Sequence, residues 1–369
     1  MGILRAPAFL ITYAVIQTLV LLLLIRFLDL YEHEPFSLVA IMALWGAVGA
    51  TALSAIGNGM VAASLSRDVD AVFGPAISAP VVEELAKGIA LIIAFGVTAW
   101  AHSRFGMMQM GGITDGIVYG AAVGLGFAFT EDLHYLLVVA AQQGLDQGLS
   151  LFLLRRDFLG MGALQHAIFT AAFGAGLGLA TWSRRIGWRS LWAVLGLLVA
   201  VLLHATNNGL VQLVLVMRYG FDETAAALGQ LGTLTPQMEA TRATVLNAMA
   251  ILDFVIVAAF ITAIVLWLRH QRRIIRFELA KEADLGLIDP RDWELVPSYW
   301  RRVQWYWQLL RVGEIERVRV IRRLHTELAG LAFLRWRLGA DSGRPEISKS
   351  RQKVANLKAQ GAVDVYAPQ

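Results

Sequence analysis

Long apolar runs dominate the pattern of hydrophobic and polar positions in this chain. A helix needs about 20 apolar residues to cross the hydrocarbon core of a bilayer, and seven stretches come near or exceed that length. They are Phe9–Phe27, Leu38–Leu65, Ile77–Ala101, Gly116–Ala141, Leu159–Trp182, Ser190–Met217 and Val245–Leu268. The pattern predicts an all-α protein, a polytopic membrane bundle of about seven transmembrane helices with a helical cytoplasmic tail.

Composition strengthens this prediction and removes several classes of protein. The 369 residues are 57% hydrophobic and 16% charged, with a mean hydropathy of +0.58, whereas soluble domains carry about 25% charged residues. A soluble enzyme is therefore excluded. The absence of cysteine from the sequence also excludes a disulfide framework, a thiolate metal site and a cysteine nucleophile.

Charge divides the chain into regions. Residues 1–269 carry a net charge of −3 and residues 270–369 a net charge of +7. We expect a transmembrane domain over 1–269, an amphipathic helical cytoplasmic region over 270–338, and a disordered tail over 339–369, where Ser, Lys and Gln are frequent. The tryptophans and arginines of 270–338 suit either a subdomain that lies on an anionic leaflet or an ordinary solvated helical hairpin.

Basic loops predict how the chain is inserted. Arg184, Arg185 and Arg189 and the arginines that open the tail place those segments in the cytoplasm, so the N-terminus lies outside. Arg155 and Arg156 then fall on the outer side, against the rule. The first stretch has no small-residue cleavage site and is predicted to be a retained anchor. We expect an integral protein of a bacterial plasma membrane.

Glycines recur at regular spacing inside two of the stretches. Gly116, Gly120 and Gly124 lie four residues apart, as do Gly174 and Gly178. Small residues at this spacing let helix backbones approach closely in lipid. We therefore expect tight packing of the helices that carry them.

Ionisable side chains inside a span are expensive, so each suggests a function. The first group is Glu83, Glu84 and Lys87, near the start of the third stretch. Adjacent carboxylates in hydrocarbon repel one another and are poorly solvated, which suits a group that handles protons. Lys87 follows them by four and three residues and can reach either carboxylate on a helix. The alternative is a buried ion pair that fixes helix rotation.

Further polar positions lie on later stretches: Glu131 on the fourth, His166 on the fifth, and His204 with Asn208 on the sixth. At about 1.5 Å per residue along helices of alternating direction, these residues and Glu83 lie within a turn or two of one plane. We therefore expect a single convergent site. Carboxylates and imidazoles without cysteine are typical of a catalytic zinc-type centre that keeps an open position for water.

In this order and on successive stretches, the motifs resemble those of the PrsW family of intramembrane proteases, within the superfamily of CAAX-prenyl proteases and bacteriocin-immunity-type proteins. The resemblance covers about residues 75–215. It rests on EExxK from Glu83 to Lys87, FxxxE from Phe127 to Glu131, His166 with the following Phe169 and Thr170, and HxxxN from His204 to Asn208. Two departures are Asn207, where such proteins often have Trp, and Asp132, where Asn commonly follows the glutamate.

The resemblance implies an intramembrane endopeptidase. It would hydrolyse a peptide bond of a membrane-anchored protein with a glutamate-activated water bound to a divalent metal, for which zinc is the expected ion. The expected partners are a single-span protein substrate, such as the anti-sigma factor of the name-giving member, and the lipid bilayer, with no nucleic acid.

Peptide hydrolysis assigns roles to the residues, because it needs an activated water, a stabiliser for the oxyanion and a proton for the leaving amine. We expect Glu83 to act as general base and Asn208 to hydrogen-bond the substrate carbonyl or the oxyanion. Glu84 is either a further ligand or the partner of Lys87, and spacing leaves open which glutamate binds and which acts as base. The expected metal ligands are Glu131, His166 and His204.

Three alternatives stay open. In a metal-free version, Glu83 and His166 activate water while His204 and Asn208 hold the oxyanion. A non-catalytic scaffold or immunity-type protein of the same fold is the second, and a proton- or ion-coupled transporter is the third. The presence of every motif residue needed for chemistry argues against the scaffold. The lack of sequence repeats and of prolines that would break the spans argues against the transporter.

Overall fold

The computed structural model describes residues 5–31, 34–105, 112–156, 161–183, 186–229, 234–339 and 344–359. The chain divides into two compact units: a transmembrane unit of residues 1–28 and 34–260, and a tail unit of residues 29–33 and 261–369. The described residues hold helices and no strand, which confirms the predicted all-α class. The units divide after Phe260, earlier than the boundary predicted after residue 269.

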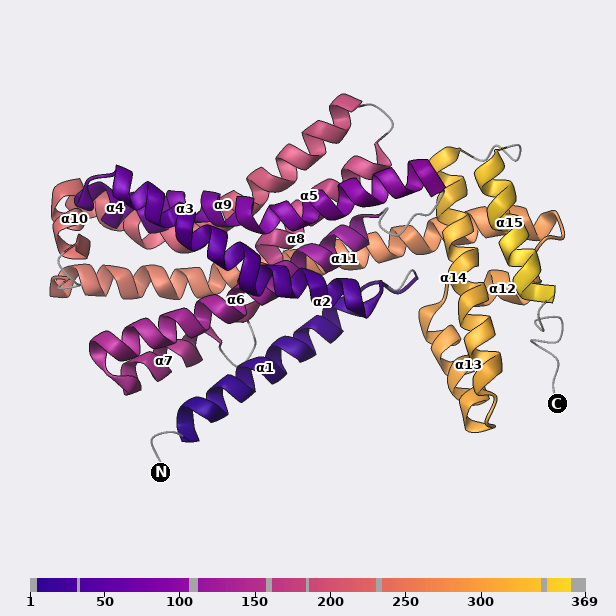
Figure 1. Ribbon diagram of the computed structural model, residues 1–369, viewed down its shortest axis with the longest axis horizontal. Helices are drawn as coiled ribbons and strands as arrows, with labels where there is room; N and C mark the ends of the chain where they lie inside the picture. Colours follow the sequence, from indigo (N-terminus) through magenta and orange to yellow (C-terminus); the bar gives the residue numbers. More distant parts are fainter. Residues whose placement is uncertain are drawn as a thin grey trace. The chain divides into compact units, whose positions relative to one another are not determined.

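Helices of very different lengths make up the transmembrane unit (Figure 1). Two of its segments, η1 and η2, are π-helical turns that interrupt longer helical segments. In chain order the elements are α1 (Arg5–Arg26), α2 (Phe36–Leu44), η1 (Trp45–Ala50), α3 (Thr51–Ser64), α4 (Arg67–Phe73), η2 (Gly74–Ser78), α5 (Ala79–Phe105), α6 (Ile113–Gln143), α7 (Leu145–Arg155), α8 (Met161–Trp182), α9 (Ile186–Tyr219), α10 (Phe221–Gly229) and the first half of α11 (Pro236–Asp284).

Six helical segments among the described residues are long and apolar enough to cross a membrane. They are α1, the continuous segment from α2 to α3, α6, α8, α9 and α11. They support the predicted membrane bundle. The remaining predicted stretch, Ile77–Ala101, overlaps α5, which is long enough to span but carries Glu83, Glu84 and Lys87 near its start. Those charges set α5 apart from an ordinary apolar span.

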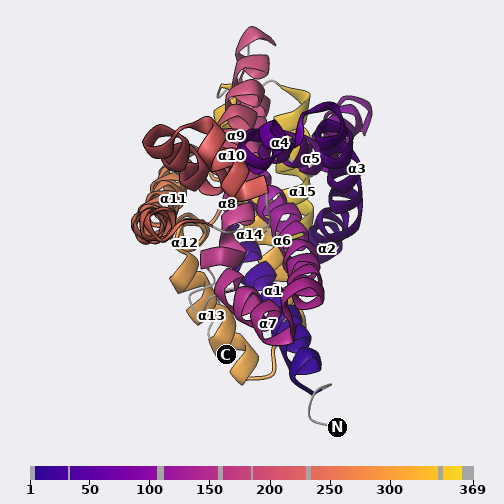
Figure 2. The ribbon, with the colours of Figure 1, turned by 90° about the vertical axis from the view of Figure 1, so that its left-hand side faces the viewer.

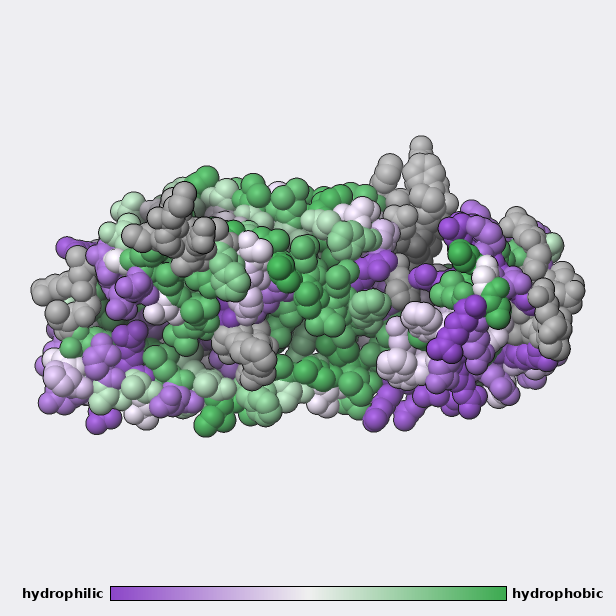
Figure 3. Space-filling model, turned by 90° about the horizontal axis from the view of Figure 1, so that it is seen from below, coloured by the Kyte–Doolittle hydropathy of each residue, from purple (hydrophilic) through white to green (hydrophobic). Residues whose placement is uncertain are grey.

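α6 and α8 form the core of the transmembrane unit. The apolar window of α6 is 89% buried and that of α8 61% buried, against 11% for both α9 and α11. Figure 2 shows α6 and α8 in the interior of the unit, with other helices around them. Hydrophobic side chains cover much of the face of this unit that Figure 3 shows, as expected for helices whose outer faces meet lipid tails.

Glycine brings α6 and α8 into backbone contact, as the spacing predicted. A Cβ atom on Gly116 would lie 2.0 Å from the carbonyl oxygen of Gly174, and one on Gly124 would lie 2.2 Å from that of His166. Both distances are far shorter than van der Waals contact, so a larger residue would push the helices apart. These glycines therefore set the distance between α6 and the helix that carries His166.

The tail unit contains the second half of α11 and four further helices, and hydrophilic side chains dominate its surface (Figure 3). Leu324, Leu328 and Leu331 lie at helical spacing on one of these helices and are buried, which gives the unit an apolar core. The four helices are α12 (Pro290–Leu295), α13 (Tyr299–Arg311), α14 (Ile315–Leu338) and α15 (Pro345–Leu357).

α15 departs from the predicted disorder of residues 339–369. Pro345 begins the helix, where its missing N–H is not needed. Ile347 and Val354, two turns apart, are both buried, and Arg351 pairs with Glu282 of α11 at 2.7 Å. Two apolar residues and one ion pair order this segment, although its composition is polar. Residues 360–369 lie outside the described residues.

Candidate active site

α5 carries the first three predicted site residues into the transmembrane unit. Glu83, Glu84 and Lys87 are 6%, 0% and 0% exposed. Lys87 follows Glu83 by four residues and Glu84 by three, which places it beside each of them on the helix surface. Lys87 Nζ lies 2.8 Å from Glu84 Oε1 and 3.8 Å from Glu83 Oε2, so Lys87 does reach both carboxylates as the spacing predicted.

Glu84 is fully engaged by donors from three helices. Its Oε1 accepts a hydrogen bond from Lys87 Nζ at 2.8 Å and lies 3.0 Å from His204 Nδ1 on α9. Its Oε2 accepts from Thr170 Oγ1 on α8 at 3.0 Å. A buried carboxylate is tolerated when both oxygens are hydrogen-bonded. Glu84 therefore joins α5, α8 and α9 and fixes the orientation of His204.

The hydrogen bonds of His204 define which of its nitrogens carries the proton. Nε2 lies 3.2 Å from Asn208 Nδ2, and an amide nitrogen can only donate. Nε2 is therefore the acceptor, and Nδ1–H donates to Glu84, an assignment made from the network. The Nε2 atom also lies 3.7 Å from Glu83 Oε2. The lone pair of His204 is thus on the side of Glu83.

His166 on α8 is held in a similar way. Its Nδ1 lies 2.9 Å from Lys87 Nζ, which can only donate, and its Nε2 lies 2.8 Å from Glu131 Oε2 on α6. Nδ1 therefore accepts and Nε2–H donates to Glu131. Both imidazoles have one N–H held by a carboxylate and a second nitrogen that accepts a hydrogen bond, from Lys87 in His166 and from Asn208 in His204.

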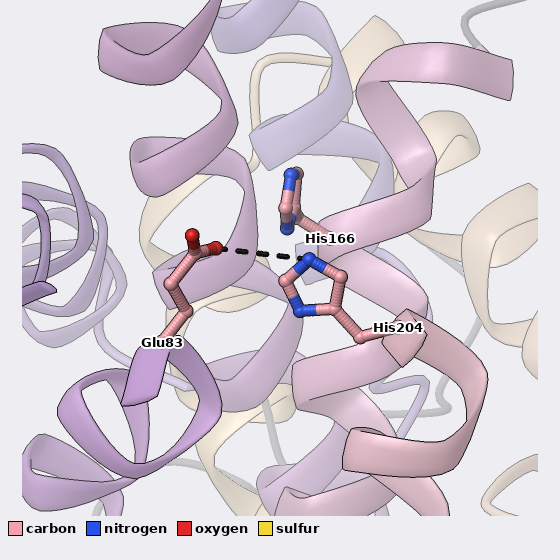
Figure 4. A group of neighbouring side chains, drawn as sticks. All are labelled: Glu83, His166 and His204. Carbon is pink, nitrogen blue, oxygen red and sulfur yellow. Dashed lines mark ion pairs between the residues drawn. The ribbon is translucent and has the colours of Figure 1, made fainter. Parts of the chain in front are cut away.

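Glu83 differs from Glu84 because it is incompletely bonded. Its Oε1 accepts a long hydrogen bond of 3.4 Å from Asn58 Nδ2 on α3, and its buried Oε2 has no hydrogen-bond partner among the described residues. Figure 4 shows Glu83 with the rings of His166 and His204 beside it. A buried oxygen without a donor is costly and is a feature of sites that act on a reactant or an ion.

The donors of this cluster fit a divalent metal ion. One ligand atom from each of Glu83, His166 and His204 lies within 4.8 Å of the other two. Two imidazoles and a carboxylate are a common ligand set of catalytic zinc, and a carboxylate on the far nitrogen is the usual support of a metal-binding histidine. Glu131, which the sequence predicted as a ligand, is not in this group and supports His166 instead.

Asp132, which departs from the family motif, pairs with Arg155 and Arg156, the two basic residues that lie on the unexpected side of the membrane. Arg155, at the end of α7, places Nη2 2.5 Å from Glu131 Oε2 and Nε 2.7 Å from Asp132 Oδ1. Arg156 Nε lies 3.0 Å from Asp132 Oδ2. Arginines paired in this way are not the free loop charges that orient a membrane protein. Arg155 also holds Glu131 beside His166.

All seven predicted site residues lie in one contact network on four helices. They are Glu83, Glu84, Lys87, Glu131, His166, His204 and Asn208. Sequence reasoning missed three of their neighbours. Asn58 could have been found as a lone amide within the second apolar stretch. Thr170 belongs to the His166 motif, but the motif alone does not predict a role for it. The position of Arg155 against the rule for basic loops was a signal, but no spacing rule links it to Glu131.

Comparison with known proteins agrees with the motif order. A family model described as PrsW family intramembrane metalloprotease matches residues 34–229. The match covers more than half of the chain and includes all seven predicted site residues. The comparison with curated proteins found no match, and neither did the comparison with solved structures.

Proposed function

The chain belongs to the PrsW family of intramembrane metalloproteases, and we propose that the cluster around Glu83 hydrolyses a peptide bond of a membrane-anchored protein. The observation that carries this proposal is the buried Glu83 Oε2, which has no hydrogen-bond partner among the described residues and lies 3.7 Å from His204 Nε2. A reactive carboxylate needs an oxygen that is free to accept a proton, beside groups that position the reactant.

Glu83 is the general base in this proposal. It takes a proton from the attacking water and later returns it to the leaving amine, which requires hydrogen-bond reach to both. Glu84 is unsuited to that role, because Lys87, Thr170 and His204 already engage both of its oxygens. This difference supports Glu83 as the base and Glu84 as the partner of Lys87, two roles that spacing alone could not assign.

The oxyanion is stabilised by Asn208 and by the positive charge of Lys87. Asn208 donates to His204 Nε2 at 3.2 Å, so its amide is already directed into the cluster. Lys87 is completely buried and lies 3.9 Å from the centre of the Phe127 ring. Donors that are fixed in place and shielded from water stabilise developing charge more strongly than solvent does.

A divalent metal, for which we propose zinc, would be held by Glu83, His166 and His204. When bound, such an ion polarises the substrate carbonyl and the water. Glu84 and Glu131 would keep the two imidazoles oriented through their far nitrogens. The second oxygen of Glu83, which has only its long bond to Asn58, would then take the proton. In this version Glu131 acts through His166.

The metal-free version is favoured by two contacts. Lys87 Nζ lies 2.9 Å from His166 Nδ1, and Asn208 Nδ2 lies 3.2 Å from His204 Nε2. Both donors would have to move before those nitrogens could bind a metal. Without a metal, Glu83 and His166 activate the water, and Lys87 supplies the positive charge that the ion would otherwise provide. His204 and Asn208 then hold the oxyanion.

The membrane, the orientation of the chain and the class of substrate are part of this proposal. We propose a bacterial plasma membrane with the tail in the cytoplasm, since the arginines after Leu268 form the strongest basic flank with those of the loop before Ser190. The proposed substrate is a protein with a single membrane span, of the kind represented by an anti-sigma factor. The wider CAAX-protease superfamily stays a prediction.

Metal content and proteolysis, measured on one preparation, test these proposals. Full-length protein in detergent is analysed by elemental mass spectrometry and then reconstituted into liposomes with a fluorescent single-span reporter. His166→Ala is compared with His134→Ala, which removes an exposed histidine of α6 outside the cluster. We expect about one equivalent of zinc and reporter cleavage in the wild type and in His134→Ala, and neither in a folded His166→Ala protein.

Other outcomes decide between the versions. Cleavage by wild-type protein that holds no metal would reject zinc and leave the metal-free mechanism. Equal loss of cleavage in both variants would show that His166 has no special role. Zinc binding without cleavage of any single-span reporter would contradict the protease proposal.

A further inference from the structure

The tail unit contains a cavity that has no place in the proposed proteolysis. It has a volume of about 550 Å³ and lies between α13 and α14, and cavities of roughly 300–1,000 Å³ commonly accept small ligands. Aromatic and basic side chains share its wall. They include Tyr299, Arg302 and Tyr306 of α13 and Arg319, Arg322 and Arg323 of α14.

Among the described residues, Arg302 is a buried cation with one unsatisfied hydrogen-bond donor. It is 5% exposed, and its Nη2 donates to the carbonyl oxygen of Leu30 at 2.7 Å, while its Nε has no hydrogen-bond partner in the part of the chain that is described. Its guanidinium lies 5.2 Å from the Tyr31 ring and 5.9 Å from the Tyr299 ring. Burial lowers the pKa of Arg302 from its ordinary value. The nearby carboxylate of Asp29 offsets part of this burial cost, but the Nε donor stays without a hydrogen bond within the described structure. A buried donor without a partner is costly, and an anionic ligand would satisfy it.

The other arginines make the mouth of the cavity strongly positive. Arg322 and Arg323 are exposed and take part in none of the ion pairs between described residues. Arg319 pairs with Glu316, and Glu327 is the one acidic residue in the described lining. Four arginines against one glutamate focus a positive potential on the cavity.

We propose that this cavity binds the phosphate of an anionic phospholipid head group. A guanidinium offers several donors in a planar fork that matches phosphate oxygens, and Arg302 has one donor free for this purpose. The tyrosine rings and aliphatic lining would cover the less polar part of the head group.

A lipid source is favoured over free phosphate by the surroundings of the cavity. α13 exposes Trp300 at 74%, and Val312, which follows α13, is 73% exposed. Tryptophan beside basic residues is typical of segments at a membrane interface. The tail unit also includes the end of the apolar run that reaches Leu268, so the chain tethers this cavity to a bilayer.

A titration of the full-length protein tests the proposal without any assay of proteolysis. Protein in neutral-detergent micelles is titrated with a short-chain phosphatidylglycerol, and binding is followed by calorimetry. The double substitution Arg322→Gln with Arg323→Gln is compared with Arg344→Gln with Lys349→Gln, which removes the same charge from exposed positions of or next to α15. We expect saturable binding that weakens at least about tenfold in the first variant and stays within about twofold in the second.

The competing results are distinct. Equal weakening in both variants would show diffuse charge attraction and overturn the site. Displacement of the lipid by an equal concentration of inorganic phosphate would show a free-phosphate site and overturn the lipid assignment. Failure of the wild type to bind phosphatidylglycerol would overturn the proposal outright.

Discussion

The tail unit and the transmembrane unit each bury a cluster of carboxylates and cations, but only the tail cluster is fully matched. Glu282 accepts two hydrogen bonds from Arg351, at 2.7 and 2.9 Å, and a third from Arg335. Glu278 accepts from Arg335 Nε at 3.1 Å and from Lys281 Nζ at 3.0 Å. Every carboxylate oxygen of this cluster has a donor.

Two neighbouring carboxylates of the transmembrane cluster differ in this respect. Glu84 is bonded through both oxygens, like Glu278 and Glu282, whereas Glu83 keeps a buried oxygen without a hydrogen bond. Burial of charge is therefore common to both units and does not by itself identify a reactive site. Asp132 Oδ2 also lacks a hydrogen bond among the described residues but lies 3.0 Å from Arg156 Nε. The open oxygen of Glu83 differs because it lies beside an imidazole nitrogen and within reach of a second imidazole, which is the arrangement of a reactive or ion-binding site.

The largest expected effect separates the two clusters by activity. Glu83→Gln keeps the shape of the side chain and removes the proton acceptor, so reporter cleavage in liposomes should fall by roughly 10²–10⁴-fold. The thermal midpoint should stay close to that of the wild type, because Glu83 Oε2 makes no hydrogen bond that would be lost. Undiminished cleavage would remove Glu83 from the mechanism.

The second prediction reverses this pattern in the tail. Glu282→Gln leaves Arg335 and Arg351 facing a neutral side chain, and an incompletely matched buried charge destabilises by about 3 kcal/mol. Chemical unfolding of the tail helices should show that loss, while cleavage per folded molecule stays unchanged. Glu316→Gln in the exposed pair with Arg319 is the control and should have no measurable effect, since surface pairs contribute little.

The third prediction concerns Arg155, which positions Glu131 and does not itself contact Glu83 or His204. Arg155→Gln releases Glu131 from one of its two contacts, and loss of such a support costs about tenfold in activity. Arg155→Lys should restore part of the rate, because it can still pair with Glu131. If the glutamine and lysine variants are equally impaired, the planar contact to Asp132 matters more than the charge.

The smallest effect is a pH dependence confined to the stability of the tail. Burial lowers the pKa of His325 from its ordinary value near 6.5. Tyr306 Oη lies 2.6 Å from its Nδ1. Asp292 Oδ1, 3.7 Å from its Nε2, favours protonation, whereas burial and the charge of Arg302 oppose it.

Because the unfolded chain binds the proton more readily, stability should be full above about pH 6.5 and decline as the pH falls through the window below it. Thermal unfolding at pH 7.5 and 5.5 should show a larger drop in the wild type than in His325→Gln. An equal drop in both would assign the acid sensitivity to other groups.

Much of this arrangement could be predicted from local patterns. The apolar stretches predicted the long helices, because a chain that crosses lipid must satisfy its backbone hydrogen bonds within the segment. The common depth of Glu83, Glu131, His166 and His204 gave their convergence, because rise per residue is fixed along a helix. These are properties of single helices that alternate in direction.

Local patterns could not predict contacts that depend on how each helix is rotated about its axis, or contacts with residues outside the motifs. Spacing could not distinguish Glu83 from Glu84, since the difference arises from Thr170 and His204 on other helices. It could not find Arg155, which reaches Glu131 from the short helix α7. In the tail, α15 was hidden because Ile347 and Val354 stand alone among polar residues.

The backbone contact between α6 and α8 has a consequence for reading mutational data. Gly116, Gly120 and Gly124 have no room for a methyl group, so a saturation survey of α6 scored by activity should find them as intolerant as Glu131. The intolerant positions would recur every four residues along α6, and most of them would take no part in the chemistry. Only a parallel readout of protein abundance would separate the helix contact from the catalytic centre.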